Sequence, residues 1–168
     1  MRRALALLAP VILLGAVLGS GAPAGAAPAG DVRFVLAGRL EDPAITVVAT
    51  GAITGVGTLS AESVDYHPAD RTYRETDLAD LGAGTLRMSV DGAFDVWPFE
   101  LDPATCTQHG ALTGTWTITA ATGDLAGSTG SGTFSGRYVT YSARDPAGCD
   151  ETAIKGFVAG SMSGTVTD

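Results

Sequence analysis

The last segment of the chain alternates large and small residues with a period of two, and this pattern strongly limits the fold. Between positions 154 and 166 the even positions carry Ile154, Gly156, Val158, Gly160, Met162, Gly164 and Val166. In a β-strand, residues two apart point to the same face, so all seven would share one face. Glycine weakens a strand unless curvature or close approach requires it. A face of alternating size fits the tapering interior of a small closed barrel.

A helix is the alternative for this segment, because Gly156, Gly160 and Gly164 also satisfy the G-x-x-x-G pattern of packed helices. That pattern needs an apolar host segment of about 20 residues. Here the polar residues Ser161 and Ser163 interrupt the segment. We therefore expect a strand.

Most of the chain after residue 30 shows the same two-residue period. Segments with apolar residues on one face lie at 32–40, 45–53, 56–66, 86–96, 115–120 and 134–141. One short helix is predicted, with Thr76 as the N-cap of residues 77–81 and Gly82 as the stop. About seven to nine strands without crossover helices predict one antiparallel barrel domain of about eight strands over residues 30–168, or alternatively a β-sandwich.

The dipeptide Asp91-Gly92 is a signal for a two-residue hairpin turn. However, such a turn would place Phe94 on the face opposite Val90 and divide the apolar residues between two faces. A three-residue loop over 91–93 keeps the apolar face whole. One long strand bent at the glycine is the alternative.

Residues 1–29 have the three parts of a secretory signal peptide. Two arginines precede an apolar run, and small residues follow, with A-x-A cleavage sites that end at Ala26 and Ala29. A membrane-spanning helix needs about 20 apolar residues, whereas glycine and proline interrupt the run here. We predict a signal peptide over residues 1–26, a secreted protein, and no membrane span in the mature chain.

The charge of the chain argues against a nucleic-acid partner. Cleavage after Ala26 removes two of the ten basic residues and none of the 18 acidic ones, which leaves a charge of −10. Lys155 is the one lysine, and no basic cluster follows the leader, so the positive surface that nucleic acids require is missing. The abundance of alanine, glycine and threonine is typical of a high-GC bacterial genome.

The two cysteines, Cys106 and Cys149, indicate a disulfide, because the count is even and the predicted compartment is oxidising. Closing a loop of about 44 residues would stabilise the fold by about 4 kcal/mol. The sequence leaves open whether the bond forms within one chain or between two.

A glycine-rich hairpin is predicted over residues 114–134. It carries the pattern T-G-x-[FL]-x-G-x-x-G at Thr122, Gly123, Leu125, Gly127 and Gly130. This segment resembles the hairpin of the allene oxide cyclase and dirigent superfamily. The resemblance implies an eight-stranded antiparallel barrel with a central cavity, which in the plant families shapes a reactive intermediate without a cofactor. No position here matches the catalytic residues of those families, so the resemblance carries the fold and not the activity.

No convergent catalytic set stands out in the sequence. Ser63, His67 and Asp70 are close along the chain, but the serine lacks the G-x-S-x-G turn of a nucleophile. Asp95 and Glu100 flank an aromatic segment, as in a glycosidase site, but exposed acids are also expected in so acidic a chain. We predict no catalytic residue, no metal site and no cofactor.

Three residues are candidates for ligand contacts: Trp97, Tyr66 and His67. Trp97 falls on the face opposite the apolar residues of its segment and is therefore the expected exposed aromatic. The function predicted is a non-enzymatic module that binds a small apolar ligand or a protein partner through its cavity or its surface. The alternatives are a cofactor-free cyclase or isomerase of the allene oxide cyclase type and a structural, envelope-associated protein.

The interior of the barrel separates these functions. A carrier predicts an apolar cavity of at least about 300 Å³. An enzyme predicts that cavity together with at least two buried polar groups whose protonation is shifted. A structural protein predicts a packed interior.

Overall fold

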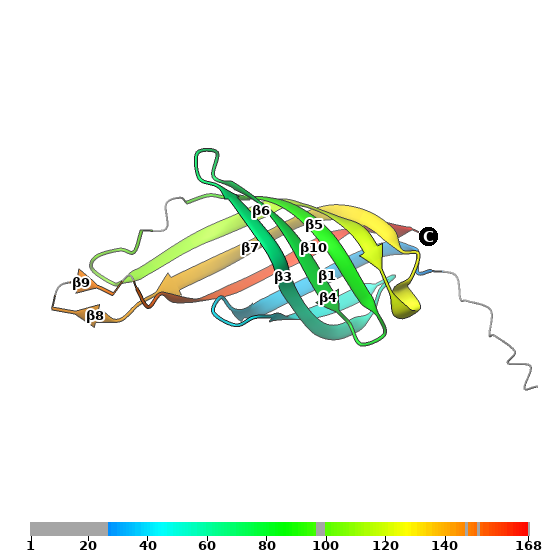
Figure 1. Ribbon diagram of the computed structural model, residues 1–168, viewed down its shortest axis with the longest axis horizontal. Coiled ribbons are helices and arrows are strands. Elements are labelled where there is room, and N and C mark those ends of the chain that lie inside the picture. The colour runs from blue at the N-terminus through cyan, green and yellow to red at the C-terminus, as the bar shows by residue number, and fades with distance from the viewer. Residues whose placement is uncertain (1–26, 97–99, 147, 151, 168) are drawn as a thin grey trace, which may run out of the picture.

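A computed structural model of the chain describes residues 27–96, 100–146, 148–150 and 152–167 (Figure 1). Eight strands form a closed antiparallel barrel in the order β1-β10-β7-β6-β5-β4-β3-β2. They are β1 (Gly30–Arg39), β2 (Ile45–Gly51), β3 (Gly55–His67), β4 (Thr72–Asp80), β5 (Thr85–Phe94), β6 (Thr107–Ala121), β7 (Thr129–Tyr141) and β10 (Lys155–Thr167). The predicted barrel is therefore confirmed, and the sandwich alternative is wrong. The predicted signal peptide, residues 1–26, lies outside the described residues.

The barrel strands are connected up and down, because each of β1 to β6 pairs with the next strand along the chain and β7 pairs with β10. A small hairpin, β8 (Arg144–Asp145) and β9 (Gly148–Cys149), is inserted between β7 and β10 and projects beyond one end of the barrel (Figure 1). A short 3₁₀ turn, η1 (Gly123–Leu125), lies at the other end. Pairing of β1 with β10 closes the sheet, so the barrel leaves no edge strand unpaired.

The large–small alternation of β10 is on the inner face of the barrel, as predicted. Met162 and Val166 are buried, whereas the odd-numbered Ala159, Ser163 and Thr165 are exposed. Ile154 precedes the strand and is exposed, so it does not belong to the inner face.

On the inner face of β10, two glycines pair with glycines of β7: Gly160 lies opposite Gly136, and Gly164 lies opposite Gly132. A Cβ atom at Gly164 would lie only 2.1 Å from the carbonyl oxygen of Ser131. These glycines therefore permit a backbone approach that larger residues would prevent.

The Asp91-Gly92 dipeptide lies within β5, which continues unbroken to Phe94. The alternative of one long strand is confirmed, and the predicted loop over 91–93 is wrong. Gly92 faces Tyr73 of β4, and a Cβ atom at this position would lie 2.3 Å from the tyrosine ring. The glycine is required for this aromatic contact rather than for a turn.

The helix predicted over residues 77–81 with Thr76 as its cap is also wrong, because these residues lie mainly in β4. Pairing with β3 on one side and β5 on the other satisfies the backbone in an extended form, which overrides a local capping signal. Gly82 ends no helix: with a φ of +78° it lies in the turn between β4 and β5, and its N–H donates to the Asp80 carboxylate at 2.9 Å.

One half of the barrel interior is densely packed with apolar side chains. Phe34 and Trp116 are fully buried and meet edge to face, with ring centroids 5.7 Å apart. The Trp116 indole N–H donates to the carbonyl oxygen of Thr133 at 3.2 Å, so its one polar atom is satisfied. This half lies toward η1 and the C-terminus of β10 and closes that end of the interior.

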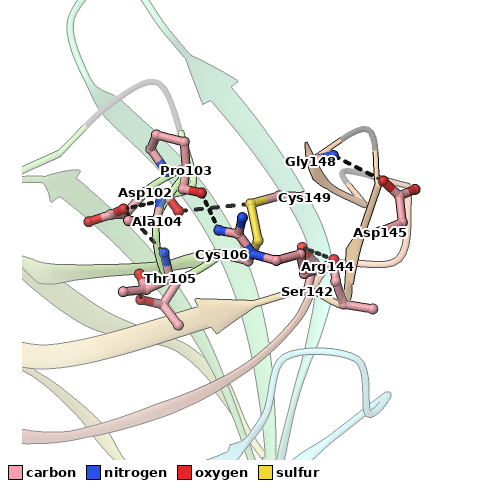
Figure 2. Close-up of a disulfide and its surroundings, with 12 residues drawn as sticks. Asp102, Pro103, Ala104, Thr105, Cys106, Ser142, Arg144, Asp145, Gly148 and Cys149 are labelled. Atoms are coloured by element: carbon pink, nitrogen blue, oxygen red, sulfur yellow. Dashed lines mark hydrogen bonds between the residues drawn. A yellow bond between two sulfur atoms is a disulfide. The ribbon is translucent and has the colours of Figure 1, made fainter.

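The disulfide forms within the chain, between Cys106 and Cys149, whose Cα atoms are 5.4 Å apart (Figure 2). It joins the segment before β6 to β9, 43 residues later in the sequence. The Arg144 guanidinium on β8 donates to the carbonyl oxygen of Pro103, which adds a second link between the β8–β9 hairpin and the segment before β6. The bond therefore fastens the projecting hairpin to the barrel.

Replacing Gly160 by valine tests the inner-face assignment. A Cβ atom at Gly160 would lie 2.7 Å from the carbonyl oxygen of Ser135, and backbone cannot yield as a flexible side chain can. We expect Gly160→Val to lower the free energy of unfolding by about 1–3 kcal/mol in urea titrations. Ala159→Val is the matched control on the exposed face of the same strand. Equal midpoints for the two variants would contradict the assignment.

Candidate functional site

The other half of the barrel interior contains a cavity of about 300 Å³. It opens beside the connection between β1 and β2, at the end from which the β8–β9 hairpin projects. Its walls are mostly apolar. All eight barrel strands contribute to them, and β2 contributes only its first residue, Ile45. The apolar lining includes Leu36, Ile45, Leu59, Val90, Phe94, Leu112, Phe134, Val158 and Met162.

Aromatic rings form one side of the cavity near its mouth. The rings of Tyr73 and Phe94 have centroids 4.8 Å apart, and the ring of Tyr66 lies 6.2 Å from that of Phe94. Tyr73 is buried, whereas Tyr66 is 51% exposed at the mouth. Burial raises the pKa of both tyrosines, so both are neutral phenols at physiological pH.

Two carboxyl groups lie in the wall of this apolar cavity. Glu75 and Asp77 are two residues apart on β4, so both point inward, and a hydrogen bond joins their side chains. Asp77 is only 5% exposed. Their neighbours on β5 are Val90 and Met88, so the adjacent strand offers them no polar partner.

The two carboxyl groups share a proton near neutral pH. Burial raises the pKa of Asp77 to about 8, and the charge and hydrogen bond of Glu75 contribute to the rise. Burial also raises the pKa of Glu75, while its hydrogen bond with Asp77 acts in the opposite direction. The neutral acid Asp77 therefore donates its hydrogen bond to the Glu75 carboxylate, and the pair carries one negative charge.

No basic side chain neutralises this charge among the residues that the structure describes. The ion pairs in the described ranges use other acids: Glu41, Asp65, Asp91 and Glu62. The site thus combines a proton donor, a proton acceptor and an uncompensated negative charge within one apolar cavity. Such a pair has the chemistry for general acid–base work or for binding a cation.

The residues predicted as ligand contacts occupy different places. Tyr66 lines the mouth of the cavity. His67 is the last residue of β3, and its Nε2 atom lies 3.4 Å from the Asp65 carboxylate at a half-exposed position. Trp97 lies outside the described residues. Asp95, considered above for acid chemistry, accepts a hydrogen bond from the backbone N–H of Ala111 at 2.6 Å.

Sequence reasoning missed Glu75 and Asp77 because it placed a helix over part of their segment. The signal was present in the alternation of Tyr73, Glu75, Asp77 and Ala79, all of which face inward. In a helix these residues would be distributed around the axis, so only the assignment of a strand brings the two carboxyls to one face.

The buried pair makes stability depend on pH. The pKa of Asp77 is about 8 in the folded protein and near the ordinary 3.8 when unfolded, so the folded state binds the proton more tightly. The resulting stabilisation is complete below pH 4 and is lost as the pH rises toward 8. We expect Asp77→Asn to flatten this dependence and, at pH 8, to raise the free energy of unfolding by at least about 1.4 kcal/mol.

Urea titrations at pH 5 and pH 8 measure both effects. Asp31→Asn is the matched control, because Asp31 is exposed on the outer face of β1. A wild-type protein whose stability does not fall between these pH values, relative to Asp77→Asn, would contradict the assignment.

Comparison with known proteins adds no relative: no family model, curated protein or solved structure matches this chain. The eight-stranded barrel implied by the hairpin at 114–134 is present. Membership of the allene oxide cyclase and dirigent superfamily is not shown. Across the described ranges, no helix has the length and apolar character needed to cross a bilayer.

Proposed function

We propose that this chain is a secreted β-barrel protein that binds a small, largely apolar molecule in its cavity. The observation that carries the proposal is the apolar cavity of about 300 Å³, which lies at the lower end of the size range of small-molecule sites. The disulfide suits the oxidising compartment that the predicted signal peptide implies.

The contrast between the two halves of the interior supports binding over a purely structural role. Trp116 and Phe34 fill the half toward η1, so this barrel does accommodate large inward side chains. In the cavity half, the inward side chains leave a space of about 300 Å³ unfilled. A barrel that served only as a scaffold would gain stability by filling that space.

A fluorescent dye tests the proposal. We expect N-phenyl-1-naphthylamine, a neutral apolar dye, to bind saturably and to be displaced by 4-phenylbutan-1-ol. Leu36→Trp places a large ring in the cavity, so dye affinity should fall at least about tenfold. Val35→Trp is the matched control, because Val35 points outward on the same strand. Absence of saturable binding, or an equal loss in both variants, would contradict the proposal.

The acid pair supports a second candidate function, cofactor-free isomerisation by proton transfer. Glu75 and Asp77 meet the expectation of two buried groups with shifted protonation. With a β,γ-unsaturated ketone in the cavity, protonated Asp77 would hydrogen-bond the carbonyl oxygen while the Glu75 carboxylate removes the α proton. Return of that proton to the γ carbon completes a balanced shift of the double bond to the conjugated position.

Conversion of oct-4-en-2-one to its conjugated isomer tests this candidate through the rise in ultraviolet absorbance. We expect a rate above that of buffer, reduced about 100-fold in Asp77→Asn and unchanged in Asp31→Asn. If the purified protein does not accelerate the reaction, or if Asp77→Asn retains the full rate, this candidate fails. Dye binding by Asp77→Asn provides the control for an intact cavity.

A further inference from the structure

We propose that the molecule held in the cavity is a lipophilic amine, whose apolar body fills the barrel and whose protonated nitrogen lies against Glu75 and Asp77. This inference rests on the proposed function, because it names the ligand class of the same cavity. It follows from the charge, the burial and the hydrogen-bonding capacity of the pair.

The first step concerns charge. Among the described residues that line the cavity, Glu75 and Asp77 are the charged groups of the interior, while Arg39 and Asp42 lie at its mouth. The Arg39 guanidinium is 3.8 Å from the Glu41 carboxylate and 5.5 Å from the centre of the Phe157 ring, so it is engaged elsewhere. A buried negative charge without a counter-ion is costly, and a ligand cation would compensate it.

The second step concerns hydrogen bonding. Asp77 is 95% buried and lines the cavity, and in the described part of the chain its one side-chain partner is Glu75. Two carboxyl groups have four oxygen atoms, and their mutual hydrogen bond uses one as the donor and one as the acceptor. A protonated primary amine has three N–H donors and no acceptor. Its hydrogen-bonding capacity therefore complements the positions that the pair leaves free.

The third step concerns the aromatic side of the cavity. Tyr73 precedes Glu75 by two residues on the same face of β4, and its ring packs on that of Phe94. Tyr66 extends this aromatic surface to the mouth. Aromatic faces attract cations and apolar groups alike, so this path favours a ligand that is both apolar and positively charged.

The charge of the pair also predicts how binding depends on pH. The titratable groups that face it are Tyr73 beside it on β4, Tyr66 from β3, Arg39 from β1 and Asp42 in the β1–β2 connection. The described lining residues of β5, β6, β7 and β10 are not titratable. Because both tyrosines stay neutral, the pair itself sets the charge: neutral in acid and negative near pH 7. Amine binding should therefore weaken in acid.

Three ligands with one carbon skeleton separate charge from apolar contact. We expect calorimetric titration at pH 7.5 in 150 mM salt to show that 4-phenylbutylamine binds at least about tenfold more tightly than 4-phenylbutan-1-ol. The anion 4-phenylbutyrate should bind most weakly, because it places a second negative charge beside the pair. The amine's advantage should shrink at pH 4.5.

A double variant locates the source of this preference. Glu75→Gln/Asp77→Asn keeps the shapes of both side chains and removes their charge, so amine and alcohol should bind with affinities within about twofold. Asp31→Asn/Asp124→Asn replaces two exposed carboxylates on the outside by amides in the same way. This control should retain the full preference for the amine, which separates the pair from the overall negative charge of the protein.

A measurement on the unmodified protein covers the case in which the double variant fails to fold. A cation beside the pair favours ionisation of both carboxyls, so amine binding should release a proton. Titrations in phosphate and in Tris at pH 7.5 would then give different apparent enthalpies for the amine and equal ones for the alcohol.

The outcomes distinguish the inference from the function on which it rests. If the alcohol and the dye bind but the amine has no advantage, or if its advantage survives in a folded double variant, the inference is wrong and the binding function stands. If the amine releases no proton, the inference is equally wrong. If neither the dye nor any of the three ligands binds, the binding function fails and the inference fails with it.

Discussion

The small side chains on the inner face of β10 are the feature on which the rest of the structure depends. Closure requires β10 to pair along its length with both β1 and β7. In the packed half, Gly164 lies under the Trp116 ring, and a Cβ atom there would come within 2.7 Å of Cζ2. In the other half, Gly136 and Gly160 face each other beside the cavity. The same alternation thus produces a dense core at one end and a cavity at the other.

The acid pair is tolerated because of this architecture. β4 is hydrogen-bonded on both sides, by β3 and β5, so its inward positions are fixed whether or not their side chains are apolar. Two carboxyls on those positions oppose stability, since neither finds a basic partner among the described residues and burial raises the pKa of both. Retaining such groups in an otherwise apolar wall is typical of a functional site rather than of a scaffold.

The sequence predicted the features that repeat along a strand and missed those that depend on neighbouring strands. The faces of β1 and β10 follow from a two-residue period that is uninterrupted, and the disulfide follows from an even cysteine count. The helix predicted around Asp77 is wrong because Thr76 and Gly82 form a plausible local helix boundary, and local signals do not contain the pairing that β3 and β5 impose. The loop predicted at Gly92 is wrong for the same reason: a glycine is required there by the ring of Tyr73, a residue distant in the sequence.

The two uses considered for the acid pair require different protonation states. Proton transfer requires that Asp77 carry the shared proton, because one group must donate while Glu75 accepts. A cation held against the pair favours the state in which both carboxyls are ionised, and so displaces that proton. An amine in the cavity would therefore remove the acid on which isomerisation depends. Desolvation by the apolar wall favours both uses. It raises the proton affinity of Asp77, and it increases the attraction between an uncompensated negative charge and a cation. Occupancy by one class of ligand accordingly excludes the chemistry proposed for the other.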